Sequence, residues 1–202
     1  MIIRKRFSYE SSHRVLEAFT KRCKENIHGH SYILEMFLSS CVLDQAEMVV
    51  DFTLLKDYFG PFIDSFDHSH LLWDIVGNEE ECDYITKHNN RWVMLPFNST
   101  AEKQAQMFFT FGVNAIKLLT SKDNILPCVK MSAARVHETA TGYAEYGCSD
   151  GLCHNYLCLN DIVFSPGIIS DWSPKFVAFY KELLEHEKYD GGTVAQSVLV
   201  SK

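Results

Sequence analysis

Two histidines lie two residues apart at the start of a β-rich stretch of the chain. His28 and His30 flank Gly29, and an alternating run continues to Leu38. In a strand, residues i and i+2 point to one face, about 7 Å apart. Two such imidazoles can hold a zinc ion if a third ligand arrives from elsewhere, and three protein nitrogens leave a fourth position open, as in catalytic sites. An isolated His-x-His motif more often consists of two hydrogen-bonded histidines than of metal ligands, so the neighbouring residues decide between the two interpretations.

The third ligand is expected to be His13. Ile2 to Tyr9 alternates like a strand that ends near His13, and residues 14–26 are polar and irregular, which predicts a loop. Pairing this strand with the one from His28 to Leu38 in an antiparallel ladder brings His13 towards the histidine pair. Three neutral imidazoles suit zinc. The alternative is that His13 is only a strand-end histidine.

Two further groups could move protons. Cys23 is surrounded by three lysine and arginine residues, and cations beside a metal would lower the pKa of its thiol enough for it to act as a base or nucleophile. An ordinary loop cysteine is the competing interpretation. Asp67 and His68 follow a helical stretch, where an aspartate could orient a histidine as a proton carrier. Taken alone, this dipeptide is more often structural than catalytic.

Two acidic residues and one cysteine cluster complete the candidates. Glu138 comes at the end of a predicted strand, where a carboxylate could accept paired donors from a heterocycle, or be a plain edge-strand charge. Glu102 is explained by the capping-box pattern that begins at Ser99. A second metal site could be formed by four residues in the C-terminal part of the chain: Cys148, Cys153, His154 and Cys158. The spacing of these residues, however, fits no common zinc pattern.

The elements that position these residues predict an α+β fold. Val49 to Phe66 has helical spacing with Asp51 as N-cap and a kink at Gly60-Pro61, and the chain is expected to turn at residues 67–72. Residues 77–91 are polar and are expected to leave the core. The other predicted elements are a helix of about twenty residues from Ser99, strands at 128–137 and 143–146, and a helix from Ser173-Pro174. Helices should therefore cover one face of an antiparallel sheet.

Bulk properties exclude several classes of protein. The 202 residues, 47% hydrophobic and 22% charged, are enough for one sizeable core. No apolar run is long enough to span a membrane, and the N-terminus lacks a secretory pattern. Seven scattered cysteines fit reduced thiols, so a cytoplasmic protein is expected. A net charge of −7 argues against nucleic-acid binding. The first 24 residues nevertheless hold seven Lys and Arg residues against two Glu residues. This local positive charge could bind an anionic small molecule, or it could be an ordinary solvated surface.

Together these residues resemble the family of 6-pyruvoyltetrahydropterin synthase and 6-carboxytetrahydropterin synthase. The matching pieces occur in family order and cover about residues 1–147: Phe7 to His13, Cys23 before His28-Gly29-His30, Val50-Asp51-Phe52, Asp67-His68, Ser99-Thr100-Ala101-Glu102 and Val136-His137-Glu138. Residues 148–202 form an extension without a match. The ordered set is specific, although each piece alone is not.

The resemblance implies a tunnelling fold, in which a four-stranded antiparallel sheet carries two helices and subunits join into a barrel. It implies a homo-oligomer, typically a hexamer, with active sites between subunits. Zinc would be held by His13, His28 and His30, and Cys23 would abstract a proton with Asp67 and His68 as relay. Glu138 would anchor the pterin ring and Thr100 would lie near it.

The resemblance leaves alternatives open. Some relatives use a glutamate as the base, and Glu25 lies close to Cys23. The favoured activity converts 7,8-dihydroneopterin triphosphate to 6-carboxytetrahydropterin, with loss of acetaldehyde and triphosphate, in the queuosine pathway. Formation of the 6-pyruvoyl product without side-chain cleavage is the alternative. A third possibility is a zinc-binding assembly protein that has lost catalysis, although the presence of Cys23 with Asp67 and His68 argues against it.

Overall fold

The computed structural model describes residues 1–123, 128–147 and 157–190. Within them, one mixed sheet has the spatial order β6-β5-β2-β1-β3-β4-β7. Its strands are β1 (Ile2–His13), β2 (His28–Ser39), β3 (Ser69–Trp73), β4 (Trp92–Leu95), β5 (Lys130–His137), β6 (Tyr143–Gly147) and β7 (Val163–Phe164). The four expected strands are β1, β2, β5 and β6, which form the antiparallel half of the sheet. The other three strands extend it beyond β1.

The helices follow capping chemistry that is visible in the sequence. They are α1 (Lys21–Glu25), α2 (Phe52–Tyr58), α3 (Gly60–Asp64), α4 (Glu79–His88), α5 (Ala101–Asp123), α6 (Pro166–Asp171) and α7 (Pro174–Asp190). The Asp51 carboxylate accepts from the Thr53 N–H as the N-cap of α2, and the expected break at Gly60-Pro61 separates α2 from α3. Ser173 caps α7 by accepting from the Phe176 N–H.

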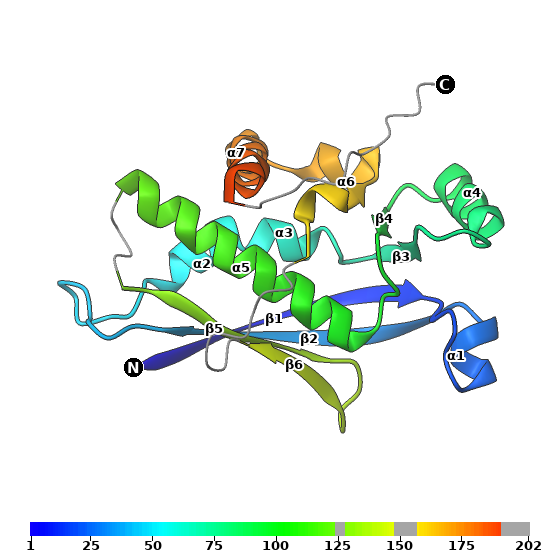
Figure 1. Ribbon diagram of the computed structural model, residues 1–202, viewed down its shortest axis with the longest axis horizontal. Coiled ribbons are helices and arrows are strands. Elements are labelled where there is room, and N and C mark those ends of the chain that lie inside the picture. The colour runs from blue at the N-terminus through cyan, green and yellow to red at the C-terminus, as the bar shows by residue number, and fades with distance from the viewer. Residues whose placement is uncertain (124–127, 148–156, 191–202) are drawn as a thin grey trace.

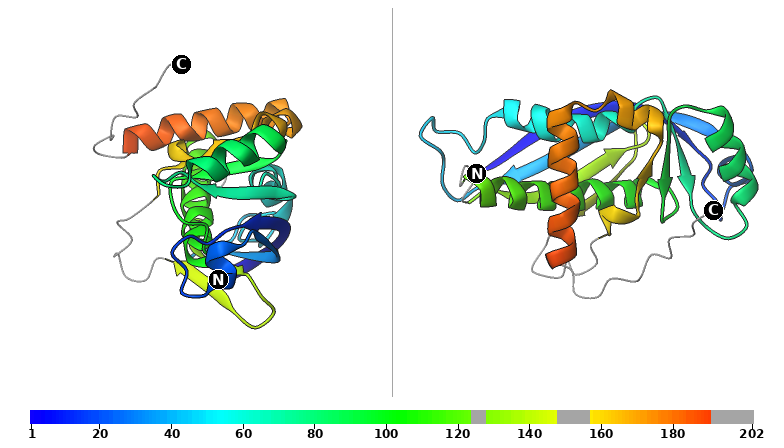
Figure 2. Two further views of the ribbon diagram at one scale, coloured as in Figure 1. Left: turned by 90° about the vertical axis from the view of Figure 1, so that its right-hand side faces the viewer. Right: turned by 90° about the horizontal axis from the view of Figure 1, so that it is seen from above.

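Helices α2, α3, α5, α6 and α7 lie on one face of the sheet, as the pattern predicted, whereas α1 lies beyond the end of β1 and β2 (Figure 1). Alternate β2 residues from Tyr32 to Leu38 are buried on that face against the apolar side of α5. Above this layer, α7 crosses α5, as the view from above shows (Figure 2). The opposite face of the antiparallel half carries no helix within the described residues. The fold is therefore α+β with its core on one side of the sheet.

β1 is the strand that joins the two halves of the sheet. It pairs antiparallel with β2 along its whole length, so that His13 lies opposite His28 and Ser11 opposite His30. On its other edge, Ser11 to His13 pair in parallel with β3. The end of β1 thus lies between β2 and β3, and this places His13 beside the histidine pair as expected.

Two local expectations, at residues 69–72 and 14–26, were wrong, and the stretch 77–91, expected to leave the core, holds a helix that was not predicted. Residues 69–72 belong to strand β3 rather than to a turn, because they are buried between β1 and β4. The polar stretch 77–91 contains helix α4, whose three glutamates in the first turn and whose last-turn Lys87 and His88 complement the helix dipole. One helical turn, α1, interrupts the predicted loop and carries Cys23.

The described part of the C-terminal extension packs on the same hydrophobic core. β7 pairs with β4, and Phe164, Phe176, Tyr180 and Leu183 belong to the buried cluster that also contains α5. The division into a domain at residues 1–147 and an extension at 148–202 stays a prediction. Three residues of the predicted second metal site, at positions 148, 153 and 154, lie outside the described residues.

Candidate functional site

His13, His28 and His30 form one cluster at the end of the β1–β2 pair. Their candidate ligand nitrogens all lie within 4.8 Å of one another. The ring centroids are 4.6 Å apart for His13 and His28 and 5.0 Å apart for His28 and His30. His13 is completely buried, whereas the other two are half-buried. The three imidazoles therefore converge from two strands on one point that solvent can reach.

Hydrogen bonds to carbonyl groups orient two of the rings. His13 Nδ1 is 3.0 Å from the Ser99 carbonyl oxygen, and His28 Nδ1 is 3.1 Å from that of Asn26. Because a carbonyl only accepts, both Nδ1 atoms donate, and in the neutral rings Nε2 keeps its lone pair free to bind a metal. His30 Nε2 is buried and has no hydrogen-bond partner. An unsatisfied buried nitrogen is costly in the absence of a ligand, so this donor set fits a metal ion.

Burial favours the neutral form of two of the three rings, His13 and His30. Desolvation lowers the pKa of His13 to about 4, with a smaller opposing effect of the Ser99 carbonyl. Desolvation also lowers the pKa of His30, and the neighbouring charge of Glu138 opposes that shift. Metal ions bind the neutral form of imidazole, so these two side chains are in the binding form at neutral pH.

Glu138 lies directly beside the cluster. Its Oε1 is 3.6 Å from His13 Nε2 and 3.7 Å from His30 Nε2, and its side chain is one-third exposed. The buried Tyr32 hydroxyl lies 3.4 Å from both ring nitrogens of His13, and its burial, together with the nearby Glu138 carboxylate, raises the Tyr32 pKa. Tyr32 was not predicted, although it follows His28 and His30 on the same strand face. The carboxylate is therefore held between the histidines and a buried phenol.

Cys23 and Thr100 share a hollow with these groups. This hollow, of about 360 Å³, is lined by Cys23, His28, His30, Thr100 and Glu138, among others. The Cys23 carbonyl accepts from the Val15 N–H, which ties α1 to the chain just after His13. The structure therefore brings six of the eight predicted site residues to one place.

The expected role of Glu102 as a capping residue was wrong. α5 begins at Ala101, so Thr100 is the N-cap, and its Oγ1 accepts from the Lys103 N–H. The Ser99 hydroxyl instead lies 3.3 Å from His13 Nδ1. Glu102 is exposed and lines the hollow that contains Cys23. Its carboxylate is thus available to a ligand there.

Asp67 and His68 form a hydrogen-bonded pair. Asp67 Oδ2 accepts from His68 Nδ1 at 2.8 Å, and its Oδ1 accepts from the Glu10 N–H at 2.7 Å. Burial alone would raise the Asp67 pKa, but these two hydrogen bonds outweigh it and lower the pKa. The His68 backbone has φ of 54° and donates to the Glu10 carbonyl, and its side chain is 76% exposed. The imidazole is therefore oriented by a carboxylate and open to solvent.

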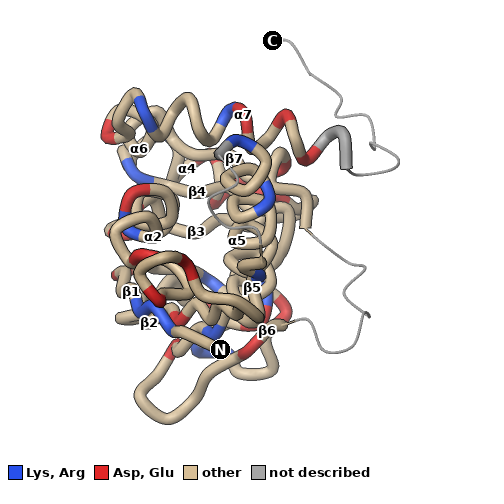
Figure 3. Tube along the Cα trace, turned by 90° about the vertical axis from the view of Figure 1, so that its left-hand side faces the viewer, with Lys and Arg blue, Asp and Glu red and all other residues tan. Residues whose placement is uncertain are grey.

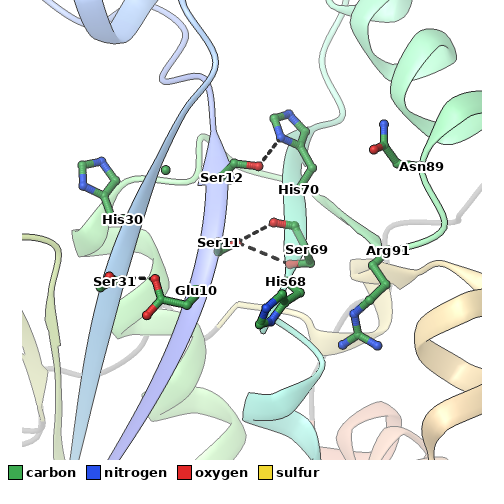
Figure 4. A pocket seen from close by; sticks show the side chains of 11 residues that line it. Glu10, Ser11, Ser12, His30, Ser31, His68, Ser69, His70, Asn89 and Arg91 are labelled. Carbon is green, nitrogen blue, oxygen red and sulfur yellow. Dashed lines mark hydrogen bonds between the residues drawn. The ribbon is translucent and has the colours of Figure 1, made fainter.

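This pair does not share the Cys23 hollow. His68 lines a second hollow, of about 440 Å³, together with Ser31 and Arg91, and His30 borders both hollows. Figure 4 shows His68 beside β3, with His30 across the other side of β2. Cys23 is not among the residues that line the second hollow. Within one subunit, the thiol and the Asp67–His68 pair thus border different spaces.

A polar network behind this second hollow was also not predicted. Ser12 Oγ is 2.8 Å from His70 Nδ1 (Figure 4), and His70 Nε2 is 3.4 Å from Glu81 of α4. Arg14 pairs with the same glutamate. Burial alone would raise the Glu81 pKa, but the contacts with His70 and Arg14 lower it. The network fastens α4 to the end of β1, beside the histidine cluster.

Comparison with known proteins identifies the family. The model of the family described as 6-pyruvoyl tetrahydropterin synthase matches residues 2–148. A protein of Helicobacter pylori strain J99 named 6-carboxy-5,6,7,8-tetrahydropterin synthase is 36% identical over 195 residues, covering 93% of this chain and 94% of the relative. A protein of the same name from Aquifex aeolicus is 31% identical, covering 71% of this chain and 96% of the relative.

Solved structures support the same fold. An uncharacterized protein of Wolinella succinogenes superposes with a TM-score of 0.57 at 22% identity, covering 74% of this chain and 98% of that one. The 6-pyruvoyl tetrahydropterin synthase of Plasmodium falciparum superposes with a TM-score of 0.52 at 19% identity, covering 72% of this chain and 96% of that one. With the family model matching most of the chain, this protein belongs to the 6-pyruvoyl tetrahydropterin synthase family.

Proposed function

We propose that this protein is a 6-carboxy-5,6,7,8-tetrahydropterin synthase. It converts 7,8-dihydroneopterin triphosphate to the 6-carboxy product and releases acetaldehyde and triphosphate, a reaction that belongs to queuosine biosynthesis. The observation that carries the proposal is the 36% identity to relatives of that name over 93% of the chain. The residues that match the family's motifs also lie together, because Glu138 is directly beside the cluster of His13, His28 and His30.

The cofactor in this proposal is zinc, held by His13, His28 and His30. The fit rests on the unpartnered Nε2 of His30 and on the two carbonyl groups that turn Nε2 of the other rings towards the cluster. When bound by three imidazoles, zinc supplies a Lewis acid that polarises a substrate oxygen. Neutral histidines in a partly enclosed site suit that role.

The remaining residues bind the substrate and move protons. Glu138 accepts paired N–H groups of the pterin ring, and Thr100 lies beside the ring in the same hollow. Cys23 is half-buried and lines this hollow, whereas Glu25 is exposed and is not among its lining residues. Cys23 therefore removes the proton from the substrate side chain. The positive charges of Lys21, Arg22 and Lys24 attract the anionic substrate.

The Asp67–His68 pair carries protons in an active site between subunits. The pair borders a different hollow from Cys23 within one subunit, so we infer that a second copy of the chain brings its own pair to the thiol. This arrangement requires a homo-oligomer, and the family resemblance suggests a hexamer. No helix among the described residues is long and apolar enough to cross a membrane, in keeping with the proposed cytoplasmic location.

Product analysis tests the activity. The purified protein is incubated with 7,8-dihydroneopterin triphosphate, and mass spectrometry should detect the 6-carboxy product together with acetaldehyde. A 6-pyruvoyl product without acetaldehyde would assign the alternative activity. Intact substrate with a zinc-loaded protein would support the non-catalytic assembly protein.

Metal analysis tests the cofactor separately. His28→Ala should lose zinc, because two imidazoles cannot complete the ligand set. His88→Ala is the matched control, because His88 lies at the end of α4 and outside the cluster. Full retention of zinc by His28→Ala would contradict the proposed triad. About two zinc ions per chain in the native protein would instead support the predicted cysteine site.

A further inference from the structure

Two cysteines face one another at the end of the sheet opposite to the histidine cluster. In the antiparallel pair of β2 and β5, Ser39 lies opposite Lys130. Cys41 and Cys128 each lie two residues beyond this last pair of the ladder. Both are free thiols, Cys41 exposed and Cys128 half-buried. This end of β2 and β5 lies at the left of Figure 1, and Figure 3 views the molecule from that side.

The two thiols interact directly. A hydrogen bond with the Cys41 side chain is the main cause that raises the pKa of the Cys128 thiol, and the nearby cation of Lys130 opposes the shift. The two thiols therefore lie close enough for one to influence the ionisation of the other. Directly opposed residues of antiparallel strands have Cα atoms about 4.5 or about 5.5 Å apart, and disulfides span about 4.4–6.8 Å. A ladder continued by two residues would therefore bring the Cα atoms of Cys41 and Cys128 within the span of a disulfide.

We propose that Cys41 and Cys128 are a reversible disulfide site that reacts with small-molecule disulfides such as glutathione disulfide. The exposed Cys41 attacks as the thiolate on one sulfur of glutathione disulfide, which forms a mixed disulfide and releases one glutathione thiolate. Cys128 then attacks the Cys41 sulfur and releases the second glutathione. The two protein thiols lose two electrons and two protons, and the glutathione disulfide is reduced to two glutathione molecules.

The bond would affect stability rather than the metal centre. It closes the long chain segment from Cys41 to Cys128, which restricts the unfolded chain and favours the folded one. The histidine cluster lies at the start of β2, whereas Cys41 follows the end of that strand. Oxidation should therefore raise the melting temperature and leave the bound zinc unchanged, whether or not the proposed reaction is correct.

The test uses the native, zinc-loaded protein incubated with glutathione disulfide. Free thiols are then alkylated, and peptides are identified by mass spectrometry without reduction. The expected result is a linked peptide pair joining Cys41 to Cys128, two hydrogens lighter than the separate peptides and lost on treatment with dithiothreitol. The melting temperature should rise on oxidation and return on reduction.

Two single variants are the controls. Cys41→Ser and Cys128→Ser each keep one of the thiols, so neither can form the bond, and glutathione should stay attached to Cys41 in the Cys128→Ser variant. Their melting temperatures should not rise on oxidation. Persistent glutathione on Cys41 of the native protein, unmodified thiols at both positions, or linkage of either cysteine to another partner would overturn the proposal.

Discussion

Glu187 of α7 is expected to fasten the C-terminal extension to the core. Its Oε1 accepts from Asn114 Nδ2 of α5 at 3.1 Å and from the Leu159 N–H at 3.0 Å. Its Oε2 accepts from the N–H and the Nδ2 of Asn160, at 3.2 and 2.9 Å. Beside these four nitrogen donors, the Cys158 thiol donates to Oε2 at 3.6 Å. All of these partners are donors, and an ionised carboxylate only accepts. Glu187→Gln keeps the size of the side chain and replaces one acceptor by a donor.

The expected loss follows from the number of bonds. Whichever position the new amide nitrogen takes, it faces two of the nitrogen donors, so two hydrogen bonds to a charged group are lost. At about 1.5 kcal/mol each, the lower end of the range because Glu187 is half-buried, the change costs about 3 kcal/mol. For a chain of this size, that corresponds to a fall in melting temperature of about 6–12 °C.

Differential scanning calorimetry at fixed protein concentration and zinc content measures this fall. Glu182→Gln is the matched control: Glu182 lies on the same helix but makes only a solvent-accessible ion pair with Lys122, so it should cost less than about 1 kcal/mol. If Glu187→Gln melts like Glu182→Gln, the carboxylate is not what holds the extension, and the reasoning from its four nitrogen donors is wrong.

Three further substitutions address the site and the sheet. Cys23→Ala should abolish turnover and leave zinc bound, and an active Cys23→Ala beside an inactive Glu25→Gln would move the base to Glu25. Glu138→Gln should weaken binding of an unreactive pterin by at least about tenfold, or about 1.4 kcal/mol, with unchanged zinc, and equal calorimetric affinities would contradict its anchoring role. Glu35 is buried, which alone would raise its pKa, but the His137 hydrogen bond and two arginines lower it. The stabilisation from ionised Glu35 should be complete above its ordinary pKa of 4.5 and should be lost as the pH falls through the lowered pKa of the folded state. The native protein should therefore be more stable than Glu35→Gln at neutral pH, and this difference in free energy of unfolding should shrink in acid.

The antiparallel half of the fold could be predicted because its signals are local. Alternation marks β1 and β2, and once the two strands pair, His13 lies opposite His28 without further information. The Asp51 cap and the Ser173-Pro174 start are equally local and were confirmed. Glu138 directly follows β5, as predicted, although its 3.6 Å approach to His13 depends on tertiary packing.

The remaining strands depend on partners far away in the sequence. Ser69–Trp73 contains two polar residues and pairs in parallel with β1, and β1 is separated from it by the whole β2 and α2–α3 region. Residues 92–95 form a short apolar run that could be a strand or a helix segment until its neighbours are known. The separation of Cys23 from Asp67–His68 into two hollows is likewise invisible in the sequence, because spacing does not show which face of the sheet a group borders.

The β1–β2 pairing also bears on the order in which the protein matures. One hairpin carries all three histidines, so a growing chain can gather them before the rest of the sheet exists. The carbonyl that turns the His13 ring belongs to Ser99, 86 residues further along the chain. If the cluster binds zinc as proposed, the two strands alone would supply its three imidazoles, and the His13 ring would be fixed in orientation only when the later segment docks. Zinc binding and completion of the core would then be successive steps of one folding process.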